Sequence, residues 1–167
     1  MIITVWRHGE AGSAATDRQR ELTDTGFDDV GFGCRQFHAA LEARGMTAPE
    51  LILFSPWLRT RETADVIAAA FTHARSRELD ALRPASNVAA LEAVLADMES
   101  GPDSPRHVVL VSHQPLVSQL VDHYLGATNP VPPLSPGGLV TLSLEVAARG
   151  CGELCFWAMP PGYEAGI

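Results

Sequence analysis

The chain has 167 residues, of which 46% are hydrophobic and 19% are charged, and its formal net charge is −8. These values fit a single globular domain over residues 1–167 with a sizeable core, and they exclude disordered and fibrous chains. The acidic balance argues against nucleic acid as a partner, because nucleic-acid binding needs a basic face.

No apolar run approaches the roughly 20 residues needed to cross a membrane, and the N-terminus lacks the pattern of a signal peptide. We therefore expect a cytoplasmic protein with no membrane partner. All twelve basic residues are arginine, which excludes lysine Schiff-base chemistry and the lysine of a Walker motif. Arginine is also the better bidentate partner for phosphate.

Residues 1–6 form an apolar run rich in β-branched and aromatic side chains, which predicts a buried first strand. Arg7 and His8 follow this strand directly, where a buried polar group is costly unless something compensates it. The small and polar stretch from Gly12 to Glu21 has the length of an active-site loop.

A helix is expected next, with Thr23 or Thr25 as its cap and Gly45 at its end. The apolar run at residues 50–54 predicts a second buried strand.

The second helix is expected over residues 57–71, with Ser55 as its cap and Pro56 in its first turn. This assignment places Arg59 and Arg61 near the positive end of the helix dipole, which attracts anions. For Arg61, a surface ion pair is an equally good interpretation.

Residues 77–84 are weakly patterned and predict a short strand or an extended loop. A helix follows over residues 87–99 with Ser86 as its cap, and residues 107–112 predict a third buried strand.

A helix over residues 115–125 and a hairpin of strands at 138–146 and 154–159 complete the expected elements. The alternation of strands and helices predicts a three-layer α/β/α fold. Its central sheet should be mostly parallel, with an antiparallel C-terminal strand pair.

Each of the three apolar strands ends in polar residues, and the carboxyl ends of parallel strands meet at one edge of a sheet. We therefore expect Arg7, His8, Arg59 and His113 to converge on one crevice. Metal binding by the two histidines is disfavoured, because adjacent arginines repel a divalent cation and no carboxylate is matched to the pair. A phosphoryl group fits better, since arginines can clamp its oxygens while a neutral His8 attacks phosphorus.

The ordered motifs resemble the histidine phosphatase superfamily, the phosphoglycerate mutase-like fold, and within it the SixA-type phosphohistidine phosphatases. The resemblance rests on five stretches that together span nearly the whole chain, at residues 7–11, 20–23, 55–63, 112–117 and 156–160. The Arg-His-Gly triplet alone is a weak signal, whereas the ordered set is strong.

This resemblance implies an enzyme in which His8 is transiently phosphorylated and then released by water. Arg7, Arg59 and His113 would form the phosphate pocket, and Arg20 matches a further arginine position of the group. No metal and no organic cofactor are implied. The implied partner is a protein that carries phosphohistidine, either a phosphotransfer domain or a phosphocarrier.

Ester-cleaving members of the superfamily usually carry a carboxylic acid after the second helix, and the resemblance places Ala81 of this chain at the matching position. An alkoxide leaving group needs a proton donor, whereas imidazole leaves phosphohistidine more easily. The missing acid therefore favours a P–N substrate, although Glu10, Glu78 and Asp80 keep an ester substrate open.

The short segment between residues 71 and 86 leaves no insertion that could close over a small substrate. An open, shallow site would suit a phosphohistidine on a protein surface. Two alternatives stay open from the sequence: a phosphatase of small phosphate esters or phosphoramidates, and a phospho-binding module without catalysis.

Overall fold

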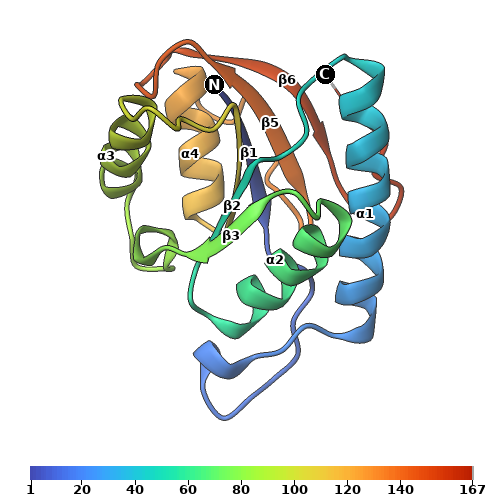
Figure 1. Cartoon of the computed structure of the whole chain (residues 1–167). Coiled ribbons are helices and arrows are strands. Elements are labelled where there is room, and N and C mark those ends of the chain that lie inside the picture. Colours follow the sequence, from blue (N-terminus) through green and yellow to red (C-terminus); the bar gives the residue numbers. More distant parts are fainter. Residues whose placement is uncertain (167) are drawn as a thin grey trace.

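The computed structural model describes residues 1–166, which form a six-stranded sheet between two layers of helices (Figure 1). The sheet order is β3-β2-β4-β1-β5-β6. The strands are β1 Ile2–Arg7, β2 Leu51–Phe54, β3 Arg75–Glu78, β4 His107–Ser112, β5 Leu139–Leu144 and β6 Gly152–Ala158. The pairs β1–β4, β4–β2 and β2–β3 are parallel, whereas β1–β5 and β5–β6 are antiparallel. The predicted fold class is therefore confirmed.

Two helices cover each face of the sheet (Figure 1). The α-helices are α1 Asp24–Ala43, α2 Leu58–Ala70, α3 Val88–Glu99 and α4 Leu116–Leu125, and short 3₁₀ turns lie at η1 Asp17–Gln19 and η2 Asp80–Leu82. Helices α1 and α2 pack on one face, and α3 and α4 pack on the other. Within residues 1–166, no helix is both long enough and apolar enough to cross a membrane.

The alternation of side chains along β1 supplies both cores. Ile3 and Val5 face the α3–α4 side and Trp6 faces the α1–α2 side, and all three are fully buried. Burial of one such side chain stabilises the fold by about 1.5–3 kcal/mol. Trp6 meets Phe37 of α1 edge to face, with ring centroids 5.4 Å apart. The first strand is therefore fixed by packing on both faces.

A buried polar cluster lies at the opposite end of the strands from the site described below. His107 Nδ1 donates to the carbonyl of Thr47 at 2.7 Å, so its Nε2 accepts from the Thr4 hydroxyl at 2.9 Å. Thr141 completes the cluster through Thr4, with 2.9 Å between the two hydroxyls. Burial lowers the pKa of His107 to about 4, so the ring is neutral near pH 7.

Two predicted helix caps are wrong, and one is confirmed. The N-cap of α2 is Trp57 rather than Ser55, whose side chain is engaged elsewhere. The cap of α3 is Asn87 rather than Ser86, because the Asn87 side chain accepts from the N–H of Ala90. Thr23 caps α1 as expected, by accepting from the N–H of Gly26.

The weakly patterned segment after α2 forms edge strand β3, which begins two residues before the predicted stretch at 77–84. All four of its side chains are exposed, so it carries no apolar alternation by which the sequence could mark it.

Candidate active site

The carboxyl ends of β1, β2 and β4 meet at the lower edge of the sheet in Figure 1. A cavity of about 310 Å³ opens there. It is lined by Arg7, His8, Glu10, Ala11, Asp17, Arg20, Arg59, Pro84, His113, Gln114 and Pro136. The structure thus brings together all five residues that the sequence predicted for the site.

His8 is buried at the cavity wall, with 8% of its surface exposed. Its Nδ1 donates to the carbonyl of Gly9 at 2.8 Å, which leaves the lone pair on Nε2. Arg59 Nε donates to that Nε2 at 3.1 Å. Burial lowers the pKa of His8 to about 4, and the charges of Arg59, Arg7 and Arg20 act in the same direction, while the bond to Gly9 opposes them. The ring is therefore neutral near pH 7 and holds the tautomer that a nucleophilic Nε2 requires.

Helix α2 holds the backbone beside His8 in place. The Thr63 hydroxyl accepts from the N–H of Gly9 at 3.0 Å and donates to the carbonyl of Arg59 at 2.7 Å. Position 9 also has no room for a side chain, since a Cβ there would lie 2.9 Å from Val30 Cγ2. One buried hydroxyl thus couples the loop after β1 to the first turns of α2.

Three arginines bring positive charge to the cavity, and each is held by main-chain carbonyls. Arg59 Nη1 donates to the carbonyl of Asp17 at 2.7 Å, and Arg7 Nη1 donates to that of Leu134 at 2.8 Å. Arg20 Nε donates to the carbonyl of Gly12 at 2.7 Å. Within residues 1–166, the buried Nε of Arg7 has no hydrogen-bond partner.

His113 faces His8 across the cavity, with ring centroids 5.2 Å apart. Its Nε2 lies 2.9 Å from the Ser55 hydroxyl, while its buried Nδ1 has no partner among the described residues. Burial lowers the pKa of His113 to about 3, and the neighbouring positive groups add to the effect. His113 is therefore neutral near pH 7, with one ring nitrogen held by Ser55, directly after β2, and the other without a partner in the described chain.

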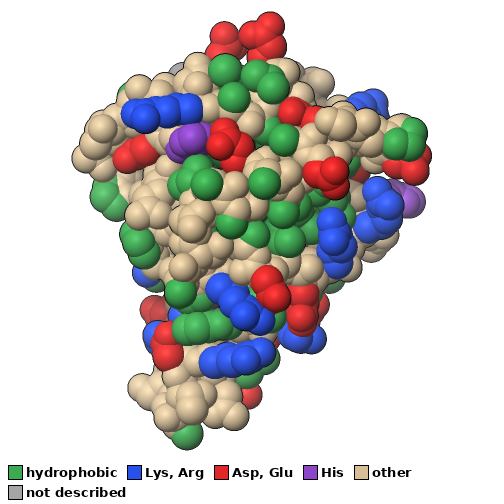
Figure 2. All heavy atoms as spheres, turned by 90° about the vertical axis from the view of Figure 1, so that its left-hand side faces the viewer, with side chains coloured by type: hydrophobic (Ala, Val, Ile, Leu, Met, Phe, Trp, Pro, Cys, Tyr) green, Lys and Arg blue, Asp and Glu red, His purple; other side chains and the backbone are tan. Residues whose placement is uncertain are grey.

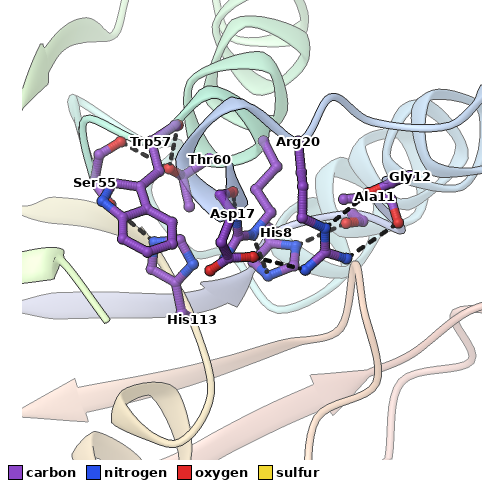
Figure 3. A network of polar contacts seen from close by, with 11 residues as sticks. His8, Ala11, Gly12, Asp17, Arg20, Ser55, Trp57, Thr60 and His113 are labelled. Carbon is purple, nitrogen blue, oxygen red and sulfur yellow. Dashed lines mark hydrogen bonds and ion pairs between the residues drawn. The ribbon is translucent and has the colours of Figure 1, made fainter. Parts of the chain in front are cut away.

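Three functional positions escaped the sequence analysis: Asp17, Ser55 and Thr63. The Asp17 carboxylate contacts Arg20 and Arg59 (Figure 3). Its only signal in the sequence is the i,i+3 spacing from Arg20, which is common in surface turns. Ser55 and Thr63 both lie in the matching stretch at residues 55–63, but Ser55 was assigned to a helix cap and Thr63 was given no role of its own.

Of the three carboxylates considered as proton donors, Glu10, Glu78 and Asp80, only Glu10 is found in the cavity lining. Glu78 pairs with Arg61, and Asp80 pairs with Arg83 at 2.7 Å. Neither lines the cavity, whereas Glu10 does, and its Oε1 accepts from the Thr23 hydroxyl at 2.7 Å. In residues 1–166, no group of three His, Cys, Asp or Glu side chains is placed to hold a metal ion.

The short segment before α3 predicted an open site, and the loop between β1 and α1 adds residues to the cavity wall. The loop of residues 12–20 projects from the lower end of the molecule (Figures 1 and 2). Its residues Asp17 and Arg20 line the same cavity as His8. Arginine and acidic side chains gather at the base of this projection (Figure 2). The wall residues Asp17 and Arg20 come from the loop between β1 and α1, not from an insertion after α2.

Comparisons with known proteins agree with this geometry. The sequence model of the histidine phosphatase superfamily (branch 1) matches residues 3–87. The chain is 28% identical over 133 residues to a phosphohistidine phosphatase SixA homolog of Haemophilus influenzae, covering 78% of this chain and 81% of the relative. The structure of the protein histidine phosphatase SixA complexed with tungstate matches with a TM-score of 0.78 and 25% identity, covering 96% of this chain and 97% of that one. A mycobacterial glucosyl-3-phosphoglycerate phosphatase has the same fold, with a TM-score of 0.70 and 18% identity over 95% and 99% of the two chains.

Proposed function

The chain belongs to the histidine phosphatase superfamily, and from this premise we propose that it is a protein phosphohistidine phosphatase acting through phosphorylated His8. The observation that carries the proposal is the state of His8: a buried, neutral ring whose Nδ1 donates to Gly9 and whose Nε2 accepts from Arg59, in a cavity lined by two further arginines. Such a ring is a competent nucleophile toward a phosphoryl group.

In the proposed reaction, Arg59 Nε gives up its hydrogen bond to the lone pair of His8 Nε2. That lone pair attacks phosphorus, and the bond to the substrate's imidazole nitrogen breaks. The electron pair of that bond goes to the leaving imidazole, which departs as a neutral ring because its other nitrogen already carries a proton. Arg7, Arg20 and Arg59 hold the phosphoryl oxygens as charge redistributes among them. Water then attacks the phosphorus of phospho-His8, which returns neutral His8 and inorganic phosphate. Because the arginines supply the positive charge, this chemistry calls for neither a metal nor an organic cofactor.

His113 contributes a donor that responds to the substrate. A phosphoryl dianion beside the ring favours the protonated form and opposes the burial that lowers its pKa in the empty cavity. The unpartnered Nδ1 would then donate to a phosphoryl oxygen, while Ser55 keeps the other nitrogen in place.

The carboxylates around the cavity favour a nitrogen leaving group. Hydrogen bonds from Arg20, together with the charge of Arg59, hold the pKa of Asp17 below its usual value. Asp17 is therefore ionised near pH 7 and has no proton to give. Glu78 and Asp80 pair with arginines outside the cavity lining. An imidazole can leave without the strong acid that an alkoxide needs, so we place the substrate among phosphohistidine proteins, either phosphocarriers or phosphotransfer domains.

A second candidate function is hydrolysis of small phosphate esters, and the position of Glu10 favours it. Its side chain lines the cavity and is exposed to solvent, from where it could protonate a leaving oxygen.

Turnover of a phosphorylated histidine protein beside p-nitrophenyl phosphate tests the proposal, with His8→Ala as control. We expect phosphate release from the protein substrate in the presence of a chelator, and none from His8→Ala. A much higher kcat/KM for the ester would contradict the proposed substrate class. Acid-labile, base-stable phosphate trapped on the wild type but not on His8→Ala would exclude a binding module without catalysis.

A further inference from the structure

The Asp17 carboxylate binds the same guanidinium groups that the proposed mechanism assigns to phosphate. Asp17 Oδ1 accepts from Arg20 Nη1 at 3.0 Å, and its Oδ2 lies 3.4 Å from Arg59 Nη2. Seen in Figure 3, the carboxylate lies between the guanidinium of Arg20 and the ring of His113. A carboxylate of the chain itself therefore already contacts two of the arginines that line the cavity.

The two sides of this contact differ in how firmly they are held. The Arg59 side chain is 5% exposed, and it is fixed by His8 and by the main chain of Asp17. The Asp17 side chain is 55% exposed and lies on η1, a single turn with no buried residue. When another anion enters, the carboxylate can turn away into solvent while the guanidinium groups stay where they are.

The contact of Asp17 with the arginines also reduces the electrostatic repulsion within the cavity. Arg7, Arg20 and Arg59 line one small cavity, and their mutual repulsion is offset in part by the single negative charge of Asp17. A phosphoryl group brings more negative charge and three oxygens, so it can replace the carboxylate on the same donors. Both anions cannot use those donors at once.

We propose that Asp17 is an internal competitor for the phosphoryl group: its carboxylate occupies Arg20 and Arg59 in the empty site and yields them when phosphate binds. The inference rests on the phosphate site of the proposed function, but not on the identity of the leaving group. Asp17 would thereby weaken the binding of free phosphate, which is the reaction product, and help to clear the cavity between turnovers.

The test is the dissociation constant of inorganic phosphate, measured by titration calorimetry on wild type and Asp17→Asn. The amide keeps the size of the side chain and removes its charge. We expect phosphate to bind about tenfold more tightly to the variant, a change of about 1.4 kcal/mol. The gain should shrink in concentrated salt, because exposed charges are screened. Equal or weaker binding to Asp17→Asn would overturn the proposal.

Two further variants separate local competition from other effects. Glu21→Gln removes a negative charge from the same loop, at an exposed side chain for which no ion pair with an arginine is found in the described chain. It should leave phosphate affinity unchanged, and a tenfold gain there would show a general charge effect and overturn the proposal. Asp17→Glu keeps the charge and should bind phosphate no more tightly than wild type.

The phosphate titration can fail separately from the proposed function. If neither wild type nor Asp17→Asn binds phosphate, the phosphate site itself is wrong and both conclusions fall. If both bind it equally while the phosphohistidine protein is still turned over, only the role of Asp17 is refuted.

Discussion

At the scale of single residues, the two histidines of the cavity are held by different means. His8 is fixed by its own neighbour, because its Nδ1 donates to Gly9. His113 depends on the residue directly after β2, since only the Ser55 hydroxyl contacts its ring nitrogens in the described chain. The aim of His113 Nδ1 at the phosphate site therefore rests on one hydroxyl that is fully buried.

Ser55→Ala should lower kcat more than it changes KM, because His113 loses its anchor while the arginines proposed to bind phosphate remain. We expect a decrease in kcat of about tenfold, which is below the roughly 10²–10⁴-fold contribution of a whole acid–base group because His113 itself is still present. Steady-state kinetics with a phosphohistidine substrate would measure it. Ser76→Ala removes the same hydroxyl from exposed strand β3 and should leave kcat unchanged; an equal effect of both variants would refute the role of Ser55.

The sequence predicted this site well where residues follow buried strands, and poorly where they contact one another through side chains. His8 and His113 could be placed because an apolar run followed by a polar residue marks the end of a parallel strand. The contact of Ser55 with His113 could not be predicted, since a serine before a helix is far more often a cap. Asp17 lies in a polar loop with no periodicity, so its contact with Arg59, forty-two residues away, becomes visible only in three dimensions.

At the scale of elements, helix α1 packs so closely on the loop after β1 that position 26, in the first turn of the helix, has room only for glycine. A Cβ at Gly26 would lie 2.2 Å from the carbonyl oxygen of Glu10. Gly31, in the same helix, would meet nothing within 4 Å. A close backbone contact thus requires glycine at position 26, whereas no contact requires it at position 31. The sequence pattern alone does not separate the two cases.

Gly26→Ala should destabilise the protein and reduce activity, because the new Cβ pushes the Glu10 backbone away and His8 lies two residues from it. Gly31→Ala should stabilise it by about 0.5–1 kcal/mol, the cost of glycine within a helix. Urea unfolding of both variants, with kcat for each, would measure the contrast. A stable and fully active Gly26→Ala protein would refute the close packing of this turn.

At the scale of the whole molecule, the fold buries three neutral histidines: His8, His107 and His113. Burial lowers the pKa of His8 and His107 to about 4 and that of His113 to about 3. An unfolded chain takes up these protons at about pH 6.5. As the pH falls from 6.5 towards 4, the unfolded state therefore gains protons that the folded state does not bind, and stability is lost in that window.

The contribution of His107 can be isolated, since it lies outside the cavity. Between pH 7.5 and pH 5, linkage gives a loss of about 2 kcal/mol from this one residue. His107→Gln should be less stable than wild type at pH 7.5, but its stability should fall less steeply towards pH 5. Urea unfolding at the two pH values would measure the slopes, with exposed His73→Gln as control. Equal slopes for wild type and His107→Gln would contradict a neutral His107 in the folded protein.

The position of β1 bears on how the chain reaches its fold. The first strand to be synthesised lies inside the sheet, where Ile2 pairs with His107 on one side and Ser143 on the other. Both neighbours follow it by more than a hundred residues, so a nascent chain carries an apolar strand with two open edges until most of its length has emerged. Pairing between strands so far apart in the sequence slows folding, and it leaves apolar surface exposed to solvent until the partner strands are available. The cavity at the end of β1 forms no earlier than this pairing, so phosphate bound there, as we propose, would stabilise only the folded protein.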